Sequence, residues 1–210
     1  PQPRAGRRKG GISLPFSIRP VRPEDAAALA AIYAPYTATC ITFESPAPPA
    51  EEFAGRIAAV SAHYPWLVCE RDGAPIGYAY AHRFRERAAY DWDAELSVYL
   101  APEARGRGVG KALYSALLSL LTLQGFINAY GTVAAPNVPS ERLHLSCGFE
   151  HVFTLRRTGW KLGAWRDLAF FHRALGEYPA SPASVVPFPE LPAEDIAARC
   201  EAAARLIRSE

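Results

Sequence analysis

The chain has 210 residues, of which 50% are hydrophobic and 21% are charged, and its formal net charge is only +2 at pH 7. This composition is typical of one ordinary globular domain with tails, and it excludes a strongly basic nucleic-acid-binding domain. No apolar run approaches the ~20 residues that cross a bilayer, so we expect no membrane partner. The 4 cysteines are widely spaced and include no C-x-x-C pair, which predicts reduced thiols, no zinc site and a cytoplasmic location.

Both ends of the chain differ in composition from its middle. Residues 1–16 are rich in proline, glycine and arginine and carry no acidic residue, so we expect a basic disordered tail there. Residues 176–192 are rich in proline and predict a linker. Residues 193–210 predict an amphipathic helix, which we expect to dock on the domain or on a partner subunit because a single helix with a narrow apolar stripe is marginal alone. Residues 17–175 remain as the folded domain.

Alternating runs, helical spacing and turn signals predict the elements in chain order. The first half predicts a strand, a helix, an extended segment or substrate-side loop, a second helix and a hairpin of two strands: Phe16–Arg19, Ala26–Tyr33, Thr37–Glu44, Glu51–His63, Trp66–Arg71 and Ile76–His82. A loop and a central strand follow, and then a long helix that ends at Gly125. The rest predicts a strand, a short helix and two strands: Ala129–Val133, Glu141–Cys147, His151–Arg157 and Trp165–Arg173. This order predicts an α/β fold, a mixed sheet with helices on its faces.

The stretch from Ala94 to Gly125 carries the main functional signal. Ala94–Leu100 alternates as a strand, and the run R-G-R-G-V-G-K (Arg105–Lys111) separates it from the long helix. Alternate glycines let backbone N–H groups approach a ligand, and the helix that follows adds the positive end of its dipole. The turn therefore predicts an anion site, most often one for phosphate. The alternative is a flexible glycine turn without a ligand.

Two common phosphate motifs do not fit this turn. A Walker loop places a glycine where this chain has Arg105, and it needs a hydroxyl where this chain has Ala112. A Rossmann turn needs a third glycine where this chain has Lys111. The turn is thus neither of these nucleotide-binding motifs.

The turn resembles the acetyl-CoA motif of the GCN5-related N-acetyltransferases (GNAT), [Q/R]-x-x-G-x-[G/A], through Arg105, Gly108 and Gly110. A second motif of that family, N-x-x-A-x-x-L-Y-x-x-x-G-F, is matched from Asn137 to Phe149, with His144 in place of its tyrosine. The segments T-F-E, A-Y-D-W and G-W-K-L-G-A-W-R-D are similar, in order, to the phosphinothricin N-acetyltransferase branch of the family. The resemblance covers about residues 17–173.

The resemblance implies a GNAT fold, in which a mixed, mostly antiparallel sheet has a V-shaped split between its two central strands. It implies direct transfer of an acetyl group from acetyl-CoA to a primary amine in a ternary complex, without a metal. On this basis we expect the central strand, the glycine turn and one asparagine to bind acetyl-CoA: Leu96, Ser97, Val98, Tyr99, Leu100, Arg105, Gly106, Arg107, Gly108, Val109, Gly110, Lys111 and Asn137. Deletion of residues 179–210 is expected to spare catalysis.

Two side chains are candidates for proton transfer. Glu95, on the central strand, fits a general base that deprotonates the incoming ammonium. Its alternative is a glutamate at a strand edge that pairs with Arg85 or Arg87. His144 is the candidate general acid for the departing thiolate, and its alternative is a helix histidine that caps or packs against the sheet.

The acceptor is expected to be a small amine. Phe43, Arg85, Arg87 and Tyr90 are the candidate pocket residues, because arginine recognises the polar oxygens of phosphinothricin, methionine sulfone or methionine sulfoximine. The alternatives are a protein N-terminus, a lysine or a polyamine as acceptor, and a non-catalytic module that binds acyl-CoA. We also expect a homodimer.

Overall fold

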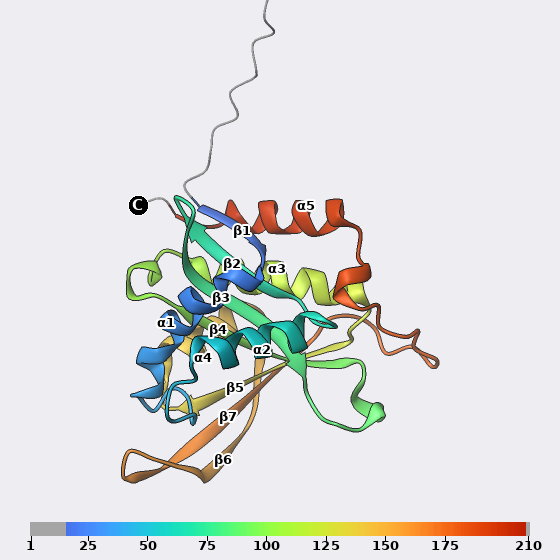
Figure 1. Cartoon of the computed structure of the whole chain (residues 1–210). Helices are drawn as coiled ribbons and strands as arrows, with labels where there is room; N and C mark the ends of the chain where they lie inside the picture. The colour runs from blue at the N-terminus through green and yellow to red at the C-terminus, as the bar shows by residue number, and fades with distance from the viewer. Residues whose placement is uncertain (1–15, 209–210) are drawn as a thin grey trace, which may run out of the picture.

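A seven-stranded sheet organises the computed structural model, which describes residues 16–208 (Figure 1). In chain order its strands are β1 (Phe16–Pro20), β2 (Trp66–Arg71), β3 (Ala74–Arg83), β4 (Asp93–Leu100), β5 (Asn128–Ala135), β6 (Glu150–Lys161) and β7 (Ala164–Ala174). Their spatial order is β1-β2-β3-β4-β5-β7-β6, and every neighbouring pair is antiparallel except β4 and β5. The predicted mixed α/β sheet is confirmed, whereas the predicted basic tail (residues 1–16) lies, apart from its last residue, outside the described residues.

Helices cover both faces of the sheet and create two apolar cores (Figure 1). On one face lie α1 (Ala26–Thr37) and α2 (Ala50–Ser61), and on the other lie α3 (Val109–Gln124) and α5 (Ala193–Ala204), with α4 (Val138–Ser146) against β5. Residues of β2 alternate between the two cores, so Leu67 packs toward α3 and Trp66 toward α1 and α2. The central helix α3 ends at Gly125, which has φ +95°, as predicted.

The two central strands pair only briefly. β4 and β5 are in parallel register over Asp93–Glu95 and Asn128–Tyr130 and then part. β4 continues to pair with β3 as far as Leu100, and β5 with β7 as far as Ala135. The facing edges beyond Glu95 therefore form the split that the resemblance implied.

The structure distinguishes the two alternatives for Thr37–Glu44. These residues form no strand, because α1 continues through Pro35 to Thr37, and the loop that was the second alternative follows. A proline inside a helix costs about 3 kcal/mol. This end of α1 is held against β4 by edge contacts of the Tyr33 and Tyr36 rings with Tyr99, at centroid distances of 4.7 and 5.2 Å.

An ion-pair cluster fixes β1 to the start of α1. Arg19 donates two hydrogen bonds of 2.7 and 2.8 Å to the Asp25 carboxylate and also pairs with Glu70 on β2. Asp25 is buried, and the Arg19 guanidinium lowers the pKa of its carboxyl despite that burial.

We predict that Arg19→Met lowers the free energy of unfolding by about 3 kcal/mol at pH 7, because it leaves the Asp25 carboxylate buried and unpaired. A carboxyl whose pKa is lowered by folding stabilises the folded state at neutral pH and loses that effect on acidification. The difference from wild type, measured by urea unfolding, should therefore shrink below about pH 4. Arg71→Met, which removes an exposed ion pair, is the control and should change stability by less than about 0.5 kcal/mol.

Candidate active site

The split between β4 and β5 contains a cleft that continues toward the glycine turn. Its inner part is lined by residues of both strand edges and of α3 and α4, and its outer part has a volume of about 200 Å³. The two parts share Ile41, Val98, Asn137 and Ser140. Of the predicted site residues, the structure brings these to the cleft: Leu96, Ser97, Val98, Tyr99, Leu100, Arg105, Asn137 and His144.

Each of the three glycines in the turn has its own physical role. Gly106 and Gly108 have φ of +75° and +88°, a region that side chains with a Cβ adopt rarely. Gly110 has an ordinary backbone, but a Cβ there would lie 3.2 Å from Leu143, at the wall of the cleft. Gly108 is also the N-cap of α3, so the first N–H groups of that helix lie in the turn without partners inside the helix.

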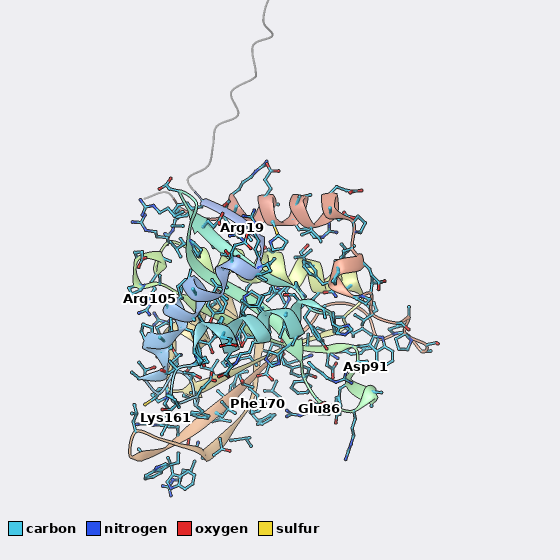
Figure 2. The ribbon with its side chains drawn as sticks, in the orientation of Figure 1. Arg19, Glu86, Asp91, Arg105, Lys161 and Phe170 are labelled. Atoms are coloured by element: carbon cyan, nitrogen blue, oxygen red, sulfur yellow. The ribbon has the colours of Figure 1, made fainter. Side chains whose placement is uncertain are left out.

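Arg105 lies where the turn meets the cleft (Figure 2). Its guanidinium donates a 3.2 Å hydrogen bond to the Tyr36 hydroxyl and lies 5.4 Å from the centre of that ring. The same hydroxyl donates to the Leu100 carbonyl at 2.6 Å and accepts from the Leu100 N–H at 3.1 Å. The end of β4 is therefore already paired with Tyr36, and the unpaired edge lies between Leu96 and Tyr99.

Glu95 is half-buried and directed to the face of the sheet that carries α1 and α2. Its neighbours in register are His82 and Tyr130, whose side chains share that face. The Thr132 hydroxyl donates a 2.6 Å hydrogen bond to Glu95 Oε1. Within residues 16–208 Glu95 forms no ion pair with Arg85 or Arg87, so the alternative role as an ion-paired strand glutamate is wrong.

His144 is buried on the opposite face. Its Nδ1–H donates to the Ser140 carbonyl at 2.8 Å, since a carbonyl can only accept, and Nε2 lies 3.3 Å from the Tyr114 hydroxyl. Its ring fits against Gly131, where a Cβ would lie 2.2 Å from Nε2. Desolvation by burial lowers the pKa of His144, so the imidazole is neutral at pH 7, and Nε2 accepts the Tyr114 proton.

Glu95 and His144 thus lie on opposite faces of one sheet. Tyr114 and Val133, with His144, line the cleft on the α3 face, while Thr132 and Ser97 reach it from the face of Glu95. The gap between β4 and β5 joins the two sides, because beyond Glu95 no ladder closes the sheet there.

The predicted acceptor residues lie in two groups. The Phe43 ring packs on Gly159 of β6, and Lys161 Nζ donates to the carbonyls of Thr42 and Glu44 at 2.6 and 2.8 Å, which fastens this loop to the β6–β7 hairpin (Figure 2). Burial lowers the pKa of the Lys161 amine.

The second group lies on the exposed loop before β4. Arg85 lies over the Phe84 ring at 4.4 Å, and Tyr90 packs edge-on against the same ring. Phe84 in turn stacks on Tyr130, the register neighbour of Glu95, at a centroid distance of 4.0 Å. Arg87 is exposed on this loop. Phe84 therefore links Arg85 and Tyr90 to the neighbourhood of Glu95.

Sequence reasoning missed five residues of this site: Tyr36, Phe84, Tyr114, Tyr130 and Thr132. Tyr114 carries a usable signal, since it is a polar aromatic residue at a core position of α3, within one helical turn of Lys111 at the end of the glycine turn. The other four are placed by pairing between distant segments, which no local pattern reveals.

Among residues 16–208, no group of three or more His, Cys, Asp and Glu side chains is arranged to hold a metal ion. In the same range no helix has the length and hydropathy that a membrane span requires.

Comparisons with known proteins agree with this geometry. The sequence matches the family described as Acetyltransferase (GNAT) domain over residues 18–170. The phosphinothricin N-acetyltransferase of Streptomyces viridochromogenes is 36% identical over 178 residues, which cover 84% of this chain and 97% of the relative. An L-methionine sulfoximine/L-methionine sulfone acetyltransferase of Salmonella typhimurium is 34% identical over 56% of this chain and 68% of its own length.

A solved structure is also similar. The phosphinothricin acetyltransferase of Sinorhizobium meliloti, crystallised with acetyl-CoA, superposes with a TM-score of 0.77 and 37% identity over 81% of this chain and 94% of that one. The chain therefore belongs to the GNAT acetyltransferase family, and it is an acetyl-CoA-dependent N-acetyltransferase.

Proposed function

We propose that residues 17–175 acetylate the amine of a small amino-acid-like acceptor, namely phosphinothricin, methionine sulfone or methionine sulfoximine. The observation that carries this proposal is the gap between β4 and β5, which joins the face of Glu95 to the face of the glycine turn. An acceptor amine and a thioester that enter from opposite faces meet in this gap. The names of two similar proteins support this class of acceptor.

The residues around the turn fit the diphosphate and pantetheine arm of acetyl-CoA. Free N–H groups at the start of α3 and the Arg105 guanidinium supply donors and positive charge for the diphosphate. We extend this assignment to the rest of the turn, Gly106, Arg107, Gly108, Val109, Gly110 and Lys111. Asn137 caps α4 with its side-chain oxygen at 3.4 Å from the Ser140 nitrogen, which leaves its amide N–H groups for the pantetheine arm.

We propose that Glu95 removes the proton from the acceptor ammonium, directly or through one water. The Thr132 hydroxyl orients the carboxylate, and donation from that hydroxyl leaves the second oxygen, Oε2, for the proton. Backbone N–H groups between Leu96 and Val98, at the unpaired edge of β4, would bind the oxyanion that forms when the amine attacks the thioester.

The proposed general acid His144 is constrained by its burial. Its neutral form holds one proton, at Nδ1, and that proton is bound to Ser140. Nε2 carries no proton in this form and accepts from the Tyr114 hydroxyl, so the proton available to the thiolate is the one on the Tyr114 oxygen. Tyr114 lines the same cleft, and its raised pKa keeps its hydroxyl protonated, so Tyr114 is the second candidate donor.

The acceptor side is proposed from Phe43, Arg85, Arg87 and Tyr90. The two arginines supply donors for phosphinate, sulfone or sulfoximine oxygens, and the aromatic rings exclude water from the amine. A protein N-terminus would need an open groove here. Instead the Thr42–Glu44 segment is tied to β6, which favours a small acceptor.

We also propose a reducing, cytoplasmic location. Cys40, Cys69, Cys147 and Cys200 are all free thiols, and three of them are buried. Burial raises the pKa of Cys69 to about 12, so this thiol remains protonated and unreactive. These features fit a chain that is not stabilised by disulfides.

The β6–β7 hairpin supports the proposed homodimer. It exposes six large apolar side chains: Val152, Phe153, Leu155, Trp160, Leu162 and Trp165. A soluble monomer seldom exposes so many on one element, and in Figure 1 the hairpin projects from the end of the sheet. A second copy that covers this hairpin would bury them.

The function is tested by release of CoA thiol from acetyl-CoA with phosphinothricin, methionine sulfone, methionine sulfoximine, spermidine and a peptide N-terminus as acceptors. We expect the first three to be the best substrates by kcat/KM. Preferred turnover of spermidine or the peptide would contradict the proposed acceptor class, and no binding of CoA at millimolar concentration would overturn the proposal entirely.

We predict that Glu95→Gln lowers kcat by roughly 10²–10⁴ and leaves the Kd of acetyl-CoA nearly unchanged, because the amide cannot accept the proton. Steady-state kinetics and calorimetry measure the two quantities. Glu103→Gln, an exposed carboxylate beyond the end of β4, is the matched control and should keep full activity. Unchanged turnover of Glu95→Gln would exclude this residue from proton transfer.

We predict that His144 makes the protein less stable in mild acid. Because folding lowers its pKa, the unfolded chain binds protons more readily below about pH 6.5, and stability then falls as the pH falls. Between pH 7.5 and 5.5 the free energy of unfolding of wild type should drop by about 1 kcal/mol more than that of His144→Asn. The exposed His63→Asn serves as control, and superimposable profiles for wild type and His144→Asn would refute the prediction.

We predict that the double variant Trp160→Ser, Trp165→Ser is monomeric at concentrations where wild type is dimeric, because the hairpin loses its two largest exposed rings. Light scattering after size exclusion measures the mass. Leu145→Ser removes an equally exposed apolar side chain from α4 and should leave the mass unchanged. A wild-type mass of one chain would contradict the homodimer.

A further inference from the structure

The last described residues of the chain lie against the glycine turn. The Arg208 backbone N–H donates to the Arg107 carbonyl at 3.0 Å, and Arg208 Nη2 donates to the Gly106 carbonyl at 2.6 Å. A Cβ on Gly108 would lie 3.3 Å from the Leu206 carbonyl oxygen. Three successive residues of the turn thus contact residues 206–208, about one hundred positions later in the chain.

This C-terminal segment, residues 206–208, is held in place by burial. It follows α5, which packs along α3 and β1 (Figure 1). Ile207 is buried in the same core as Cys200 and Ala203 of α5 and Val109 of α3. The position of Arg208 is therefore fixed by the apolar contacts of the residue before it.

The preceding segment, residues 176–192, is also fastened to the domain. Trp92 Nε1 donates to the Ala183 carbonyl at 2.7 Å, and the Val186 N–H donates to the Gln124 carbonyl at 2.8 Å. Phe188 and Leu191 are buried. The chain thus runs from β7 to α5 along the surface of the domain rather than as a free tether.

The two hydrogen bonds from Arg208 set the direction of N–H groups in the turn. In a trans peptide the C=O of one residue and the N–H of the next point in opposite directions. Since the Gly106 and Arg107 carbonyls are directed at Arg208, the N–H groups of Arg107 and Gly108 are directed away from it. These are two of the donors assigned above to the diphosphate.

The turn therefore has a supported side and an open side. Gly108 approaches Leu206, whereas Gly110 approaches Leu143 and Leu100 at the wall of the cleft. The C-terminal segment lies behind the turn and does not line the cleft that leads to Glu95.

We propose that residues 206–208 are a positioning element of the acetyl-CoA site, which holds the glycine turn in the conformation that binds the diphosphate. This proposal rests on the proposed function of the turn. Residues 206–208 lie beyond residues 18–170, over which the chain matches the family. The proposal assigns them a role in the affinity for acetyl-CoA. The element acts through the backbone of the turn and touches no reacting atom.

The test compares two substitutions at Arg208 in the full chain. Arg208→Ala removes the bond from the guanidinium, and Arg208→Pro also removes the backbone donor. Both keep the buried Ile207 side chain, and Arg208→Ala also leaves the backbone of Ile207 unrestricted. Arg205→Ala is the matched control, because it removes the same charge three residues earlier, where the Arg205 guanidinium pairs with Glu201 of α5 and not with the glycine turn.

We expect the Kd of acetyl-CoA, measured by calorimetry, to rise a few-fold in Arg208→Ala and about tenfold in Arg208→Pro. The KM for acetyl-CoA should rise in parallel, while kcat at saturating acetyl-CoA and the KM of the acceptor stay unchanged. Hydrogen exchange of the peptide that contains the turn should be faster in Arg208→Pro without any ligand. Arg205→Ala should match wild type in every measurement.

The results separate this proposal from the proposed function. If wild type does not bind acetyl-CoA, the proposed function fails, whatever the variants do. If wild type binds and Arg208→Pro binds equally well, or if Arg205→Ala weakens binding as much as Arg208→Ala, the positioning role is wrong and the site stands. A fall in kcat with an unchanged Kd would also overturn it.

Discussion

The structure depends on two parallel strands that pair over three residues and then part. Each strand is held on its other edge, β4 by β3 and β5 by β7, so neither needs the other to stay extended. Tyr36 pairs with both backbone groups of Leu100 at the far end of β4. The backbone groups between these points face a cleft, and buried backbone groups must find partners, so this edge is a place for a ligand with polar atoms.

Because β4 and β5 separate beyond Glu95, side chains from both faces of the sheet line the same cleft. Ser97 and Thr132 line this cleft from the α1 and α2 side, where Thr132 also donates to Glu95, and Tyr114 and His144 line it from the α3 and α4 side. Gly131 has no Cβ, so the imidazole can lie directly against β5. Burial also lowers the pKa of His144 and keeps its imidazole neutral. Nε2 is therefore a hydrogen-bond acceptor, and the Tyr114 hydroxyl is the donor.

The sequence alone predicted the parts of the site that local patterns encode. Period-two alternation, glycine spacing and helical spacing identified β4, the turn and α3, and they correctly put Glu95 on β4. It did not predict Thr132 or Phe84, because their contacts depend on strand register and loop packing. It left Thr37–Glu44 open between an extended segment and a loop. The structure has the loop, where the β-branched residues form local bonds: Thr39 Oγ1 donates to the Tyr36 carbonyl, and the Thr42 and Tyr33 hydroxyls share a hydrogen bond.

The C-terminal helix α5 is a second element whose existence the sequence predicted and whose contacts it did not. Its apolar stripe predicted that the helix docks, but not on which surface. The expectation that deletion of residues 179–210 spares catalysis assumed that these residues form a tail without contacts to the acetyl-CoA site. The contacts argue otherwise, since that deletion would remove α5 from the face of α3 on which it packs and would release the carbonyls of Gly106 and Arg107. A turn built from glycines has the most conformations to lose on binding, so an outside support that restricts it before acetyl-CoA arrives lowers the entropic cost of binding.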